Sequence, residues 1–283
     1  LNLQLNNLVS ERTSMFVQVG AELLFLYPLT HEEGHRSILT ANGIGSISQP
    51  YFNSKGVAYV NGVKDVDLIN LKNNDLPTYI RLHTGGLESD YMLTNRIETL
   101  ILFGSDNINN LKIDYLLKKT SIISYYSYSM ISALSPKLEE EEDELERDIV
   151  GHDVYGAVRN LHKIDTAFYR YTDYDDLSRE EIKFVRRVGS RSFINLLSPL
   201  LFKQLKLIKK ENIQISAGAG YSMSPFGDFI DENIWIKYKN KYNVHTYFRQ
   251  FQNKNNWFMG GGIGLVDYKI SSKIKTSITT HIN

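Results

Sequence analysis

Apolar residues recur at helical spacing through the first part of the chain. Phe16, Val19 and Leu23 fall on one helix face, and the pair Asn42-Gly43 is a typical signal for the end of a helix. Further helical stripes lie within 110–134 and 148–163. These patterns predict a mainly helical region.

A separate apolar stripe follows two consecutive glycines. Leu87, Tyr91 and Ile97 are spaced as on one face of a helix. Because Gly85-Gly86 is typical of a flexible turn, the pattern predicts that this helix starts near Gly86.

The period of the pattern changes at about residue 211. Ile213, Ile215 and Ala217 alternate with Gln214 and Ser216, and similar alternation continues to the last residues. This predicts an antiparallel meander of about five strands, most of them about ten residues long. The fold class expected is therefore α+β, with a helical domain over 1–208 and a β-meander over 211–283.

One face of the predicted strands is apolar and aromatic, whereas the other carries Gly, Ser, Lys and His. In a soluble protein the apolar face would pack on a core. In an outer-membrane barrel it would face lipid, and the small polar side chains would line the lumen. Strand length and tight turns favour a part of a membrane β-barrel, although five strands do not close one.

The amino-acid composition argues against several classes of function and site. Lys+Arg and Asp+Glu are equal at 32 each, so no net charge attracts nucleic acid, and we expect none as a partner. There is no cysteine, so a metal site must use His, Asp or Glu. No run of about 18 apolar residues occurs, which predicts no conventional transmembrane helix.

The segment His31-Glu32-Glu33-Gly34-His35 matches the pattern H-E-x-x-H. Residues four apart on a helix leave the same face, so both imidazoles can bind one zinc ion. Glu32 would then lie beside the metal, where it can take a proton from a metal-bound water. The alternative is a solvated helix end that happens to be rich in His and Glu.

A catalytic zinc needs a third protein ligand. The first choice is Glu88, near the predicted helix start, although an acidic residue there also complements the helix dipole. The second choice is the segment with Asp148, His152 and Asp153, which could supply the third ligand or orient a ligand from the second shell.

The segment HEEGHRSILTANGIG resembles the H-E-x-G-H helices of zinc metallopeptidases, including the site-2-protease-like group. The later GGLESD looks like the gluzincin plan, in which a downstream Glu completes the site. The richness in Lys, Asn, Ile and Tyr, with the C-terminal meander, looks like an outer-membrane protein of a Bacteroidetes-type bacterium.

These resemblances imply a zinc-dependent metallopeptidase at the bacterial outer membrane, with one Zn²⁺, a peptide or protein substrate and lipid contact through the β-region. Other outer-membrane proteins are expected as further partners, and a periplasmic soluble location is the alternative. The rival hypothesis is a non-catalytic barrel or assembly component in which the H-E-x-x-H site is vestigial or structural.

Overall fold

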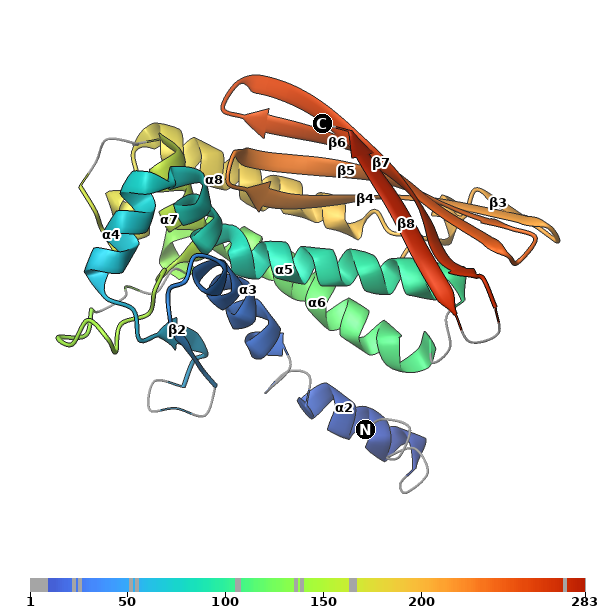
Figure 1. Ribbon diagram of the computed structural model, residues 1–283, viewed down its shortest axis with the longest axis horizontal. Coiled ribbons are helices and arrows are strands. Elements are labelled where there is room, and N and C mark those ends of the chain that lie inside the picture. Colours follow the sequence, from blue (N-terminus) through green and yellow to red (C-terminus); the bar gives the residue numbers. More distant parts are fainter. Residues whose placement is uncertain are drawn as a thin grey trace.

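The computed structural model describes residues 10–21, 24, 27–50, 53, 56–104, 108–134, 137, 140–162, 167–271 and 274–282. Its helices precede its main sheet along the chain, and the long helix α5 runs beneath that sheet (Figure 1). The fold class α+β is therefore confirmed. The α-helices are α2 (Glu11–Ala21), α3 (Tyr27–Ala41), α4 (Asp65–Asn74), α5 (Leu76–Phe103), α6 (Ile108–Ser129), α7 (Asp153–His162) and α8 (Arg179–Arg191).

Two antiparallel sheets accompany these helices. A small hairpin consists of β1 (Ile47–Gln49) and β2 (Tyr59–Asn61). The main sheet has six strands in the order in which they follow one another along the chain. These are β3 (Ile208–Lys210), β4 (Ile213–Ser224), β5 (Gly227–Tyr238), β6 (Tyr242–Asn253), β7 (Asn256–Lys269) and β8 (Lys275–Ile282).

The main sheet confirms the predicted antiparallel meander and adds the short strand β3 to it. Its two edges are β3 and β8, so the described strands form an open sheet. None of the described helices combines the length and the apolarity that a bilayer crossing requires.

One apolar core joins the helices to the sheet. Tyr91 of α5 and Tyr126 of α6 share this core with Tyr221 of β4 and Phe229 of β5. A polar contact adds to it, because the Tyr91 hydroxyl donates to the buried carboxylate of Asp231 at 2.7 Å. Helix α5 is thereby held between the sheet and α3, and its position fixes the site described below.

The predicted start of α5 near Gly86 is wrong. The helix begins ten residues earlier, at Leu76, where the Asp75 side chain accepts a hydrogen bond from Thr78 N and Pro77 occupies the first turn. Gly85 and Gly86 therefore lie inside a helix, where glycine is normally unfavourable.

Packing accounts for these two glycines. A Cβ atom on Gly34 of α3 would collide with the Gly85 carbonyl, and one on Gly86 would lie 2.5 Å from Nε2 of both His31 and His35. The glycines thus allow α3 and α5 to approach closely, and they leave open the space beside the two imidazoles.

Candidate metal centre

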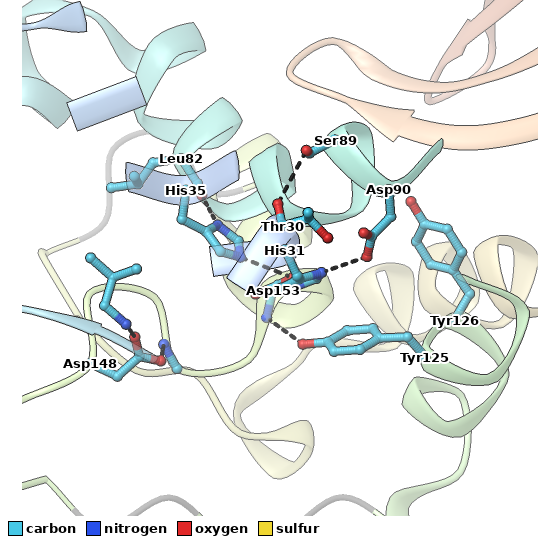
Figure 2. Close-up of polar contacts among 12 residues, drawn as sticks. Thr30, His31, His35, Leu82, Ser89, Asp90, Tyr125, Tyr126, Asp148 and Asp153 are labelled. Carbon is cyan, nitrogen blue, oxygen red and sulfur yellow. Dashed lines mark hydrogen bonds and ion pairs between the residues drawn. The ribbon is translucent and has the colours of Figure 1, made fainter. Parts of the chain in front are cut away.

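Helix α3 carries the H-E-x-x-H residues, and both imidazoles leave the same face, as predicted. The ring centroids of His31 and His35 are 5.0 Å apart. Both Nε2 atoms point toward the carboxylate of Asp153, the first residue of α7 (Figure 2). The distances from Asp153 Oδ2 are 3.0 Å to His31 Nε2 and 3.4 Å to His35 Nε2.

The remaining nitrogen of each ring is held by a separate acceptor. His35 Nδ1 donates to the Leu82 carbonyl at 2.6 Å, and His31 Nδ1 donates to Asp90 Oδ2 at 2.9 Å. Since Nδ1 of each ring carries the hydrogen, Nε2 is left with the lone pair in the neutral imidazole. Backbone carbonyls and carboxylates orient metal-binding histidines in this way in known metal sites.

These donors fit a metal ion. One ligand atom from each of His31, His35 and Asp153 lies within 4.8 Å of the other two, and this group could hold a metal. With bonds of about 2.0–2.1 Å in tetrahedral geometry, two ligand atoms of a zinc ion lie roughly 3.3 Å apart. The observed separations from Asp153 are close to that value. The missing side chain at Gly86 keeps the same space free.

The third member of this group is Asp153, one of the second choices, and Glu88 is not part of it. Glu88 accepts hydrogen bonds from Thr84 Oγ1 at 2.5 Å and from Arg81 Nε at 3.1 Å. It lines a different pocket, together with Ser37. Residue 88 lies about 200° around the axis of α5 from Gly86. Its side chain therefore leaves the helix on the side away from the histidines.

Asp90 is a site residue that the sequence patterns did not indicate. It follows Gly86 by four residues and Leu82 by eight, so all three lie on one face of α5 and all three meet the histidines. Its second oxygen, Oδ1, accepts from the buried Lys118 of α6 at 2.7 Å. The segment GGLESD contains the four-residue spacing from Gly86 to Asp90. This spacing becomes informative only when the glycines are placed inside a helix.

Asp148 and His152 orient the loop before α7 rather than joining the three ligand atoms. The Asp148 carboxylate accepts from the backbone N–H groups of Ile149 at 2.7 Å and Gly151 at 3.0 Å. His152 stacks on Tyr155 with ring centroids 3.7 Å apart. A helical stripe was predicted from residue 148 onward, but α7 starts only at Asp153.

The charges of the group stabilise one another. Burial alone would raise the pKa of Asp153, but His35 and His31 hold it well below its usual range. Burial alone would lower the pKa of His35, but Asp153 raises it to about 9. When no metal ion is bound, protons on the two imidazoles supply the positive charge that balances the Asp153 carboxylate.

The three candidate ligands and Glu32 line one pocket, which has a volume of about 560 Å³. Burial raises the pKa of Glu32. Burial and the nearby Glu32 raise the pKa of Asp148, another lining residue, to about 7. Tyr125 also lines the pocket, and its hydroxyl oxygen accepts a hydrogen bond from Asp153 N at 3.2 Å.

The chain matches no protein-family model, and neither the curated proteins nor the solved structures give a match. Inference about function therefore rests on the geometry of this group and its pocket.

Proposed function

We propose that the chain is a zinc-dependent metallopeptidase whose metal ligands are His31, His35 and Asp153. The observation that carries this proposal is the convergence of three ligand atoms on one point, with a glutamate in the same pocket. Two imidazoles and one carboxylate, with a further position open, are one of the ligand sets that hold a catalytic zinc. When bound, the ion would polarise a carbonyl and lower the pKa of water.

Glu32 is the proposed general base. It is placed next to His31 in the sequence and lines the pocket with both histidines. Its raised pKa suits a group that accepts a proton from the attacking water and returns it to the leaving amine nitrogen. Water thereby adds across the peptide bond, and the products are a carboxylate and an amine.

The pocket also suits a peptide. Leu24, Pro28, Val57 and Val150 line it together with the polar groups and supply apolar surface. Such walls with few polar groups are typical of sites that bind organic ligands. Side chains of a peptide substrate would contact these walls, while its carbonyl group would lie near Glu32.

We further propose the bacterial outer membrane as the setting. The support is a set of exposed apolar side chains that share one face of strands β5 to β8. Contiguous exposed apolar surface of this kind marks sites of interaction with proteins or membranes. Lipid, or another outer-membrane protein, would cover it. The exposed side chains are Ile234, Phe248, Met259, Ile263, Ile278 and Ile282.

The decisive experiment compares two neighbouring glutamates. Glu32→Gln should retain one zinc per chain but lose at least 100-fold in hydrolysis of a quenched fluorescent peptide library. Glu33→Gln is the matched control, because Glu33 is exposed and pairs with Arg36 at 2.9 Å outside the pocket. It should retain both zinc and activity.

Metal content is measured on the same proteins. His35→Ala should reduce bound zinc to well below one per chain after zinc-replete purification. Full activity in Glu32→Gln, or a wild type that binds no zinc, contradicts the proposal. Zinc binding without any activity in the wild type instead supports a non-catalytic outer-membrane component with a structural metal.

A further inference from the structure

A second cavity lies beside the C-terminal end of α5, whereas the residues that meet the histidines lie in the N-terminal half of this helix. Its volume is about 510 Å³, which lies within the range of pockets that bind small organic ligands. The C-terminal end of α5, the first half of α6 and strands β3 to β5 surround it. It shares no lining residue with the candidate metal centre.

The floor of this cavity is apolar. Trp235 and Tyr115 are 2% and 1% exposed and line it together with Ile101. Their polar atoms are already occupied, since Trp235 Nε1 donates to Thr99 Oγ1 at 2.9 Å and the Tyr115 hydroxyl donates to Ser198 Oγ at 2.6 Å. The aromatic rings therefore offer apolar contact to a ligand bound in the cavity.

The rim of the cavity is basic. Lys112, Lys206, Lys209 and Lys237 line it, and no acidic side chain does so among the described residues. Lys237 donates to the Phe103 carbonyl at 2.9 Å and so covers the negative end of α5. The other three have no ion-pair partner in the described part of the chain.

This local excess of positive charge is not a property of the whole chain, whose basic and acidic residues are equal at 32 each. A cluster of amino groups around one opening raises the local concentration of anions. The apolar floor beneath it favours a ligand that also carries a hydrocarbon part.

We propose that this cavity binds an anionic amphiphile, with a carboxylate or phosphate head at the lysines and a hydrocarbon tail on the floor of Trp235, Tyr115 and Ile101. A fatty acid and a single-chain lipid phosphate share this chemistry. The proposal is independent of the metal centre and of any peptidase activity.

Binding can be followed through Trp235. The chain has only two tryptophans. In the variant Trp257→Phe, all tryptophan fluorescence therefore comes from Trp235. Dodecyl phosphate and dodecanoate, both below their micelle-forming concentrations, should change its fluorescence with saturation. Dodecanol and inorganic phosphate should bind at least tenfold more weakly. Comparison of the two anionic probes shows which head group the lysines prefer.

Tail length and charge give two further readouts. Each methylene added between octyl and dodecyl phosphate should tighten binding about three- to fourfold, as expected for a buried hydrocarbon chain. The double variant Lys206→Glu/Lys209→Glu should weaken dodecyl phosphate binding at least tenfold. Its matched control is Lys137→Glu/Lys183→Glu, in which both lysines are exposed and lie outside the cavity.

Three results would overturn the proposal. The first is no saturable change with either anionic probe. The second is equal affinity for dodecanol, which removes the role of the lysines. The third is equal affinity for inorganic phosphate, which removes the role of the apolar floor.

Discussion

At the scale of single residues, the second contact of each imidazole decides which nitrogen faces the candidate metal position. Asp90 holds His31 through Nδ1 and is itself held by Lys118, which is 2% exposed. The buried lysine compensates the charge of the buried carboxylate, so the Lys118–Asp90 pair that supports His31 carries no net charge.

Asp90→Asn tests this chain of contacts. An amide is a weaker acceptor and can present N–H to Nδ1, which disturbs the orientation and the tautomer of His31. We expect zinc affinity to fall about 10- to 100-fold, the usual effect of losing such a partner. Competition with a chelator measures it. Glu88→Gln changes a carboxylate on the same helix and should leave zinc affinity unaltered.

Tyr125 would serve the proposed reaction rather than hold the metal ion. Its oxygen accepts from Asp153 N, and no acceptor for its own hydrogen occurs among the described residues. That hydrogen can therefore be donated into the pocket that Tyr125 lines. Burial raises the pKa of Tyr125 well above its usual value, which keeps the phenol protonated. Such a donor can stabilise the negative charge that develops on a substrate carbonyl oxygen.

Tyr125→Phe should therefore lower kcat by about 10- to 100-fold while zinc content stays at one per chain. The control is Tyr126→Phe, because the Tyr126 hydroxyl contacts Ser222 and Met223 N outside the pocket. An equal loss of kcat in both variants would indicate a general structural effect and contradict the role of Tyr125.

At the scale of elements, the close approach of α3 and α5 controls the site. Gly86→Ala places a methyl group against both Nε2 atoms. We expect a loss of at least tenfold in zinc affinity and a decrease of about 1–3 kcal/mol in the free energy of unfolding, as for other overpacked sites. Zinc titration and urea unfolding measure the two effects.

Gly20→Ala is the matched change in another helix. No described atom lies within 4 Å of a Cβ at Gly20 in α2, so alanine adds helix propensity there without a collision. The free energy of unfolding should stay the same or rise by up to about 1 kcal/mol. Destabilisation of both variants to the same extent would mean that the contact between α3 and α5 is not the cause.

The same two glycines show why the sequence predicts some elements better than others. Alternation of apolar and polar residues over ten or more positions is specific to strands, and the meander from about residue 211 is confirmed. A Gly-Gly pair is ambiguous, because turns and close helix contacts both require it. The choice depends on Gly34, which is 51 positions before Gly85, and no local pattern reports such a contact.

The residues of the candidate site differ in the same way in how far they can be predicted from local sequence. His31, Glu32 and His35 lie within five residues, so helix geometry alone brings them together. Asp153 comes from 118 positions further along the chain than His35, and only the packing of α7 on α5 brings it to the imidazoles. Asp153 follows a turn in which Gly151 has a φ of 63°. The sequence does not reveal this turn, so it could not distinguish Asp153 from Asp148 as the third ligand.

At the scale of the whole molecule, the sheet carries a half-buried histidine beside a tryptophan that contacts helix α5. His245 of β6 stacks on Trp235 with ring centroids 5.3 Å apart and donates through Nε2 to Asn233 Oδ1 at 2.9 Å. Burial lowers the pKa of His245 to about 4, although the charge of Asp231 acts in the opposite direction.

This shift makes the stability of the molecule depend on pH. The folded chain does not protonate His245 until the pH is about 4, whereas the unfolded chain protonates it from about 6.5. The unfolded state therefore binds more protons between these values, and the free energy of unfolding decreases as the pH falls through this window. The contribution of this single group is on the order of 3 kcal/mol.

His245→Gln should remove this part of the pH dependence. We expect the variant to be less stable than the wild type at pH 7, because its side chain stacks less well on Trp235, and to lose less stability between pH 6.5 and about 4. Urea unfolding of the metal-free proteins measures both values, since zinc release then affects neither. His281→Gln, on the exposed strand β8, is the control. If the slopes of wild type and His245→Gln were equal, the half-buried position beside Trp235 would not keep the histidine neutral.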